Sequence, residues 1–168
     1  MATCDVSKIT DNLYLGNMYA AYNINRLKSI GIEKILTVMN EFGNTYPKNT
    51  FIHKIIEIED IYDSNIIKYF KECINFIEGK EKVLVHCAAG ISRSSTIVIA
   101  YIMWKNKESL NDAINFVKSK RPAIFPNSGF IDQLKIFDKL LKENKYDLDK
   151  INFKKIKVKT ASKDCIIT

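Results

Sequence analysis

The pattern of hydrophobic and polar positions predicts a chain in which short strands alternate with amphipathic helices. Aliphatic runs typical of buried strands are followed by stretches whose apolar residues recur every three or four positions and end at glycine or polar caps. The expected strands are a hairpin over 8–16 and runs at 32–39, 51–58 and 83–86, and the expected helices are 18–30, 65–78 with Ser64 as cap, 93–105, 110–120 and 128–141. We therefore predict an α/β fold, a single domain with a central twisted mixed sheet of about four to five strands and helices on both faces.

The stretch 83–94, Val-Leu-Val-His-Cys-Ala-Ala-Gly-Ile-Ser-Arg-Ser, carries the clearest chemical signal. Its strand ends at Cys87, a loop of small residues follows, and a helix opens at Arg93. At such a junction the loop N–H groups converge beside the positive end of the helix dipole, which makes an anion site suited to phosphate. The same field favours a thiolate on Cys87, and the planar guanidinium of Arg93 can hold two phosphate oxygens at once. A buried cysteine beside a surface arginine is the plainer reading, but it leaves the flanking strand and helix signals unexplained.

The pattern His-Cys-x5-Arg-Ser resembles the cysteine-dependent protein phosphatases, in particular their small dual-specificity branch. The opening segment 8–16 and the segment 121–130, Arg-Pro-Ala-Ile-Phe-Pro-Asn-Ser-Gly-Phe, also resemble this family, so the resemblance covers most of the chain. It implies the cysteine-phosphatase fold and a protein phosphatase that hydrolyses phosphotyrosine and phosphoserine or phosphothreonine through a phosphocysteine intermediate. The resemblance implies no cofactor and no metal.

The resemblance also assigns roles to individual residues. Asp60 is the expected general acid, which protonates the leaving oxygen and later activates water, with Glu59 and Asp63 as rivals and a solvated loop acid as the plainer reading. Ser94 is expected to hydrogen-bond to the departing thiolate, or simply to satisfy donors at the helix start. The residues expected to bind the phosphate are Ala88, Ala89, Gly90, Ile91, Ser92 and Arg93. The residues expected to support the loop are His86 and Asn127.

Other functions remain open on the sequence. The loop between Cys87 and Arg93 contains no Lys or His, whereas phosphatases of inositol lipids usually carry added basic groups there, so phosphoinositide or RNA 5′-phosphate substrates are the second choice. A non-catalytic phosphate-binding module is the third, and the presence of Cys87, Arg93 and Asp60 together argues against it. No separate phosphotyrosine-recognition loop precedes Ile32, which favours a shallow pocket. The remaining histidine, His53, is interpreted as a strand residue without a function.

Length and composition indicate one globular domain. The chain has 168 residues, 46% of them hydrophobic, and we expect the catalytic domain to occupy 1–146. No signal peptide or membrane span is recognisable, so a cytoplasmic location is expected. The cysteines lack metal-ligand spacing and suit a reducing compartment, and Cys73 follows an apolar helical stripe that predicts a core position. The four cysteines are Cys4, Cys73, Cys87 and Cys165.

The positive charge is concentrated in the segment 147–168, which we expect to be a basic tail. The chain carries a formal net charge of +7, and the stretch 150–168 contains six lysines against Asp164. The final tetrapeptide Cys165-Ile166-Ile167-Thr168 resembles a prenylation box, although Thr168 is not among the usual last residues. A prenyl group on Cys165 and the lysines together would hold the protein on an anionic membrane surface. The alternative is a solvated lysine tail with an incidental cysteine. Nucleic acid is not expected, because Phe153 is the only aromatic residue among these lysines.

Overall fold

The computed structural model describes residues 5–40 and 46–158, and its centre is a five-stranded mixed sheet. The strand order is β1-β2-β5-β3-β4. Three pairings join β2, β5, β3 and β4 in parallel, and β1 runs antiparallel to β2. The strands are β1 (Val6–Lys8), β2 (Leu13–Gly16), β3 (Ile32–Val38), β4 (Ile52–Ile56) and β5 (Lys82–His86). The predicted α/β class with a mixed sheet is confirmed.

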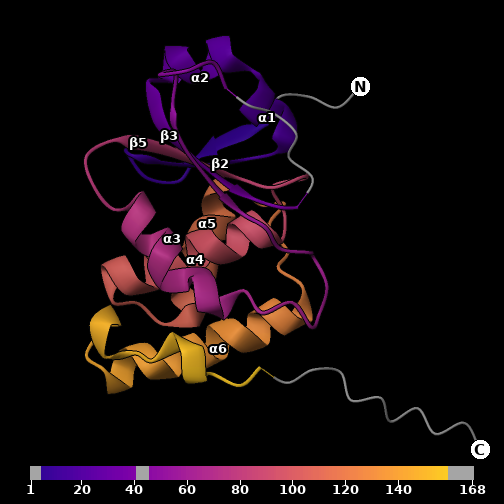
Figure 1. Cartoon of the computed structure of the whole chain (residues 1–168). Helices are drawn as coiled ribbons and strands as arrows, with labels where there is room; N and C mark the ends of the chain where they lie inside the picture. Colours follow the sequence, from indigo (N-terminus) through magenta and orange to yellow (C-terminus); the bar gives the residue numbers. More distant parts are fainter. Residues whose placement is uncertain (1–4, 41–45, 159–168) are drawn as a thin grey trace, which may run out of the picture.

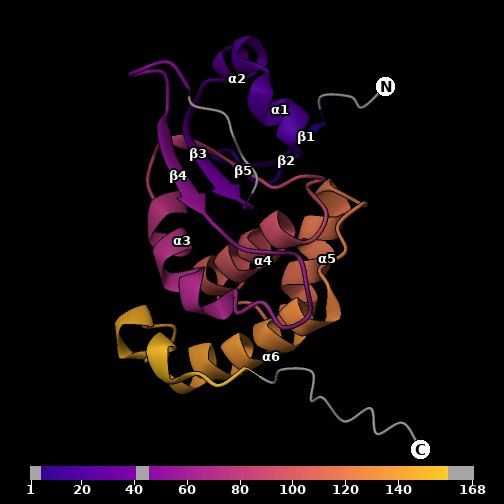
Figure 2. The same cartoon turned by 45° about the vertical axis from the view of Figure 1, so that its right-hand side comes forward.

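Helices cover both faces of this sheet, as predicted. Figures 1 and 2 show α1 and α2 on one side of the sheet and α3, α4, α5 and α6 on the other. The α-helices are α1 (Met18–Tyr22), α2 (Ile24–Ile30), α3 (Phe70–Ile77), α4 (Arg93–Asn106), α5 (Leu110–Lys120) and α6 (Ser128–Glu143). Three 3₁₀ turns complete the described part of the chain: η1 (Ile67–Tyr69), η2 (Leu148–Lys150) and η3 (Phe153–Lys155).

The helix expected over 18–30 is two helices, because Asn23 interrupts it. The Asn23 side chain accepts a hydrogen bond from the backbone N–H of Arg26 at 3.0 Å, so it caps the start of α2. An asparagine that satisfies a backbone donor in this way favours a helix start over a helix interior. Apolar periodicity continues across the break, which is why the pattern alone predicts a single helix.

The expected cap at Ser64 is wrong. The segment after it forms the turn η1, and α3 begins only at Phe70, without a side-chain cap. Instead, Oε1 of the buried Gln133, on the distant helix α6, accepts hydrogen bonds from the N–H groups of Ile66 and Ile67 at 2.8 and 3.0 Å. Asn65 of the same segment accepts from the N–H of Lys68 at 3.4 Å, so the shorter bonds at this helix start come from tertiary structure.

The larger part of the core lies between the sheet and α3, α4, α5 and α6, with α4 at its centre. Every residue of α4 from Ser94 to Met103 is buried, which agrees with a helix that is apolar on nearly all sides. A smaller apolar cluster lies under α1 and α2. Because β2, β5 and β3 are parallel, their carboxyl ends lie at the same end of the sheet. The loop that begins at Cys87 starts at that end.

The first half of the segment expected as a basic tail packs against the domain. Leu148, Ile151 and Phe153 are buried and belong to the main core, and the ring of Phe153 lies 6.1 Å from that of Phe137 on α6. Figures 1 and 2 show this yellow segment beside α6. Cys4 and the residues 159–168, with the proposed prenylation box at Cys165, lie outside the described residues, so the domain boundary remains a prediction.

Candidate active site

Cys87 follows β5 directly, and its sulfur is buried among hydrogen-bond donors. The residue is 2% exposed. Its Sγ accepts a hydrogen bond from the N–H of Gly90 at 3.3 Å and another from the Oγ–H of Ser94 at 3.1 Å. Both donors favour the negative thiolate over the neutral thiol. The structure thus brings Cys87 and Ser94 together as the sequence predicts.

The loop 88–92 has the geometry of an anion site. Each of its carbonyl oxygens accepts a hydrogen bond from surrounding structure, so the carbonyls point away from the loop centre. In a trans peptide the following N–H points in the opposite direction, so these N–H groups turn inward. The N–H of Met18 donates to the carbonyl of residue 88, and the Arg121 guanidinium donates to those of residues 89 and 90. The N–H of Phe125 donates to the carbonyl of residue 91, and the hydroxyl of Thr96 donates to that of residue 92.

Gly90 is required by this loop on two counts. Its φ of +69° lies in the left-handed region that side chains disfavour. A Cβ on Gly90 would also come within 2.5 Å of the carbonyl oxygen of Gly16 at the end of β2. The glycine therefore lets the loop pack against β2 while its own N–H donates to Cys87.

Asp60, which the sequence favours over Glu59 and Asp63 as general acid, lies directly against the loop. Its Oδ1 accepts hydrogen bonds from the Ser92 hydroxyl at 2.7 Å and from Asn127 Nδ2 at 2.8 Å. Its Oδ2 is 3.8 Å from Nε of Arg93. A carboxyl group 27 positions before the nucleophile in sequence is thus held at the rim of the anion site.

Arg93 and Asn127 complete the constellation. The Arg93 side chain is largely buried; its NH1 donates to the Ile58 carbonyl at 3.3 Å, and its buried Nε has no hydrogen-bond partner among the described residues. Asn127 caps α6, while its backbone N–H donates to the Ser92 hydroxyl at 3.1 Å. Asn127 therefore supports the loop through Ser92 and also positions Asp60, a second contact that sequence reasoning did not foresee.

Comparison with known proteins decides the family. The model of the dual specificity phosphatase catalytic domain matches residues 13–139. The chain belongs to the dual specificity phosphatase family. It is 44% identical over 137 residues to dual specificity protein phosphatase 1 of Arabidopsis thaliana, covering 79% of this chain and 69% of the relative. It is 40% identical over 144 residues to dual specificity protein phosphatase 1B of the same plant, covering 83% and 86%.

A solved structure has the same fold. The crystal structure of human tyrosine phosphatase-like serine/threonine/tyrosine-interacting protein superposes with a TM-score of 0.79 at 32% identity, covering 83% of this chain and 99% of that chain. The family match and these relatives together make the chain a dual-specificity protein phosphatase, a hydrolase. They do not favour the phosphoinositide, RNA or non-catalytic alternatives.

Arg121 is a residue of this phosphatase whose role the sequence did not reveal. It is 3% exposed, and its guanidinium forms a bidentate pair with Asp5 at 2.9 and 2.6 Å. The same group donates to the carbonyl oxygens of Ala89 and Gly90 at 3.3 and 2.8 Å. The sequence reading treated Arg121-Pro122 as the end of a helix within a family-like segment. The structure shows a buried cation that ties the phosphatase loop to the first described residue.

His86 is the end of a hydrogen-bonded chain across the sheet. Its Nε2 lies 2.7 Å from Oγ1 of the buried Thr37, and that oxygen lies 2.8 Å from Nε2 of His53. Burial lowers the pKa of His86 to about 3, so its ring is neutral at physiological pH. Sequence reasoning predicted a supporting role for His86 but assigned none to His53 and overlooked Thr37.

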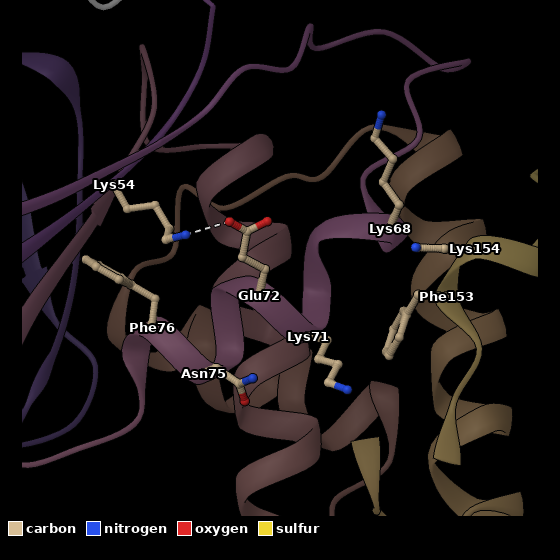
Figure 3. A pocket seen from close by; sticks show the side chains of 8 residues that line it. All are labelled: Lys54, Lys68, Lys71, Glu72, Asn75, Phe76, Phe153 and Lys154. Carbon is tan, nitrogen blue, oxygen red and sulfur yellow. Dashed lines mark hydrogen bonds and ion pairs between the residues drawn. The ribbon is translucent and has the colours of Figure 1, made fainter. Parts of the chain in front are cut away.

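A separate groove of about 570 Å³ lies beside β4, α3 and η3, and its lining contains none of the candidate catalytic residues. Figure 3 shows lysine side chains around it and the ion pair between Lys54 and Glu72. The Nζ of Lys54 lies 2.5 Å from Oε1 of Glu72. The lining residues are Lys54, Lys68, Lys71, Glu72, Asn75, Phe76, Phe153 and Lys154. Within the described ranges, neither this groove nor any other site gathers three His, Cys, Asp or Glu side chains around a possible metal position.

Proposed function

We propose that this phosphatase hydrolyses phosphotyrosine and phosphoserine or phosphothreonine in proteins through a phosphocysteine on Cys87. The observation that carries the proposal is the environment of its sulfur: two hydrogen-bond donors, a loop of inward N–H groups and the Arg93 guanidinium at the start of α4. This combination stabilises both a thiolate and the phosphate that it attacks.

In the first step the Cys87 thiolate attacks phosphorus while the bond from phosphorus to the ester oxygen breaks. The loop N–H groups and Arg93 bind the equatorial oxygens, whose charge they stabilise in the transition state. Protonated Asp60 gives its proton to the leaving oxygen, because the alkoxide of serine or threonine is a poor leaving group. The products are the free hydroxyl of the substrate and phosphocysteine.

In the second step water attacks the phosphocysteine. Asp60, now a carboxylate, accepts a proton from that water, and the sulfur leaves as a thiolate. The Ser94 hydroxyl, 3.1 Å from Sγ, donates a hydrogen bond to the departing sulfur and lowers the barrier to its release. Inorganic phosphate is released, and both Cys87 and Asp60 return to their starting forms.

Turnover of a small aryl phosphate and of phosphotyrosine and phosphothreonine peptides, in EDTA and reductant, tests this mechanism. Cys87→Ser is expected to abolish hydrolysis, whereas Cys73→Ala, at the buried cysteine of α3, leaves it. Asp60→Asn is expected to lower kcat on the phosphothreonine peptide about a hundredfold or more, and less on the activated aryl ester. Glu59→Gln and Asp63→Asn are the matched controls.

Each contrary outcome refutes a stated part of the proposal. Turnover that survives Cys87→Ser would refute the role of Cys87 as nucleophile. A larger loss of kcat in Glu59→Gln or Asp63→Asn than in Asp60→Asn would refute the role of Asp60 as general acid. Binding of phosphate without turnover by the native protein would mean that the constellation serves recognition alone.

We also propose that lysines of the segment 147–168 and a prenyl group on Cys165 hold the phosphatase on an anionic membrane surface. Lys150, Lys154 and Lys155 are exposed on the described part of this segment. No helix within the described ranges is long and apolar enough to cross a bilayer. A prenyl chain plus a basic patch is the combination that gives stable attachment.

The mass of the intact protein, made in a cell that prenylates proteins, tests this second proposal. The expected mass corresponds to a prenylated Cys165, and Cys165→Ser should remove both the added mass and flotation with anionic vesicles. An unmodified Cys165 followed by intact Ile166-Ile167-Thr168 would refute the anchor.

A further inference from the structure

Three polar side chains from three neighbouring strands form a line that ends beside the catalytic loop. His53 lies in β4, Thr37 in the adjacent β3, and His86 in the central β5, one residue before Cys87. Strand register places Thr37 opposite His86 and Ile35 opposite His53, so the three side chains share one sheet face. Ile35 belongs to the cluster under α1 and α2, which identifies that face.

The hydroxyl of Thr37 determines how protons are ordered along this line. It has one hydrogen and faces two imidazole Nε2 atoms, at 2.7 Å in His86 and 2.8 Å in His53. Among the described residues this buried hydrogen has no other acceptor, so Thr37 donates it to one ring. The other Nε2 lies against the lone pairs of the hydroxyl oxygen and therefore carries a proton, which it donates to Thr37.

One of the two orders agrees with the surroundings of His86. The backbone of Cys87 interacts with the His86 ring in the way that favours a protonated ring nitrogen. Because Nε2 faces Thr37, the order that agrees with this interaction has the proton on Nδ1. A neutral His86 with Nδ1–H has a bare Nε2, which accepts from Thr37, and Thr37 then accepts from Nε2–H of His53.

We propose that His53 is a positioning residue for Cys87. Its Nε2–H donates to Thr37, Thr37 donates to His86, and this relay holds the His86 ring in the Nδ1–H tautomer against the backbone of the nucleophile. The inference rests on Cys87 being the nucleophile, and it adds a surface-reaching residue on β4 to the machinery that orients the loop. Groups one contact removed from a metal ligand commonly change activity by about tenfold or more when lost, and we expect a loss of similar size for this relay.

The relay does not act as a pH switch. Nε2–H of His53 is a donor in both the neutral and the protonated ring, so titration of His53 leaves the bond in place. The titratable neighbours are His86, which is neutral, and Tyr46, whose ring centroid lies 4.9 Å from that of His53 and whose hydroxyl donates to the Ala21 carbonyl. Burial lowers the pKa of His53, so its ring is neutral at neutral pH. Burial raises the pKa of Tyr46, and nearby Tyr22 raises it further, so its hydroxyl is neutral as well.

Nitrogen-15 spectra of the histidine rings test the proton order directly, because the chain has two histidines. The full chain labelled with ¹⁵N-histidine should show one ring that is neutral with Nδ1–H between pH 6 and 8. His53→Phe removes the signals of His53, so the signals that remain belong to His86. These remaining signals should shift, because the relay is lost in this variant. An Nε2–H tautomer for His86, or resonances unchanged by His53→Phe, would overturn the inference.

The rate of Cys87 alkylation by iodoacetate, followed against pH, tests the effect on the nucleophile. Thr37→Val and His53→Phe should each lower the rate at pH 6 about tenfold, and the double variant should lower it no further, since both break the same relay. Thr37→Ser, which keeps the hydroxyl, should restore the native profile. Tyr46→Phe is the matched control, because it alters the other ring beside His53 and leaves the relay intact.

The result distinguishes failure of the relay from failure of the mechanism. Additive effects of the two variants, or a native alkylation profile in His53→Phe, would overturn the relay while leaving Cys87 as nucleophile. Turnover that survives Cys87→Ser would instead refute the mechanism, and the tautomer of His86 would still report on the relay.

Discussion

Two buried cysteines in this phosphatase show how surroundings decide the chemistry of a thiol. Cys73 on α3 lies in the apolar core, where burial, assisted by nearby Glu72, raises the pKa of its thiol and keeps it neutral. Cys87 is equally buried, but its sulfur accepts hydrogen bonds from Gly90 and Ser94. The first is a core residue, as its helical stripe predicts, and the second is equipped to act as a nucleophile.

His86 links the catalytic loop to the pH dependence of stability. Burial lowers its pKa from 6.5 to about 3 in the folded state. Between these values the unfolded chain binds a proton that the folded chain does not, so stability must fall as the pH is lowered through this window. The loss is about 1.4 kcal/mol per pH unit, or about 2 kcal/mol from pH 6.5 to pH 5.

Urea unfolding of the native protein and of His86→Gln at pH 7.5 and 5.0 measures this contribution. The variant should be less stable at pH 7.5 but should lose less stability on acidification. An equal loss in both proteins would show that His86 does not titrate in this way.

The arrangement of residues that belong to one contiguous pattern was predictable from the sequence. Cys87, Arg93 and Ser94 lie within a strand-loop-helix unit whose chemistry is local, and the placement of Asp60 followed from the family resemblance. Arg121 and His53 contact residues far away in the chain, and these contacts depend on the packing of the whole fold. No spacing in a single sequence encodes such contacts.

At the scale of elements, the loop between β5 and α4 is held by groups from several segments. Arg121, after α5, bonds to two loop carbonyls, and Asp5 holds its guanidinium in place. The Arg121 hydrogen bond also lowers the pKa of Asp5, which keeps that carboxylate charged. The loop therefore depends on an ion pair that neither β5 nor α4 contains.

Arg121→Lys is expected to loosen the loop, because an ammonium group cannot bond to Asp5 and to both carbonyls in the same geometry. The free energy of unfolding should fall by about 3 kcal/mol, since Arg121 is buried, and kcat/KM for an aryl phosphate should fall about tenfold. Urea unfolding and steady-state kinetics measure both. Lys118→Gln, which changes an exposed cation in the last turn of α5, is the control, and equal effects of the two changes would contradict this role.

Element types were predictable wherever periodicity was strong, and boundaries failed where tertiary contacts took over. The strands and α4, α5 and α6 follow from aliphatic runs and helical stripes. The break at Asn23 and the late start of α3 do not, because Gln133 on α6 replaces the cap that Ser64 was expected to provide. Local sequence patterns cannot predict a helix boundary when a distant residue takes the place of a local cap.

At the scale of the whole molecule, the basic segment after α6 has two parts. Lysines suggested a solvated tail from residue 147, yet Leu148, Ile151 and Phe153 are buried in the main core. The apolar residues are spaced among lysines that remain exposed, so composition alone concealed the packing. The described part of this segment stabilises the catalytic domain.

Shortened chains test this packing. A chain ending at residue 158 should unfold at the same urea concentration as the full chain. A chain ending at residue 146 should lose about 3–6 kcal/mol, because three apolar side chains leave the core. Equal stability of all three proteins would show that 147–158 adds nothing to the domain.

The most direct test of the whole account is to trap the phosphoenzyme. Native protein is mixed with a phosphotyrosine peptide, quenched in acid within milliseconds, digested and sequenced by mass spectrometry. The account predicts phosphate on the sulfur of Cys87, and none in Cys87→Ser. Phosphate on another residue, or rapid turnover without any phosphocysteine, would contradict it.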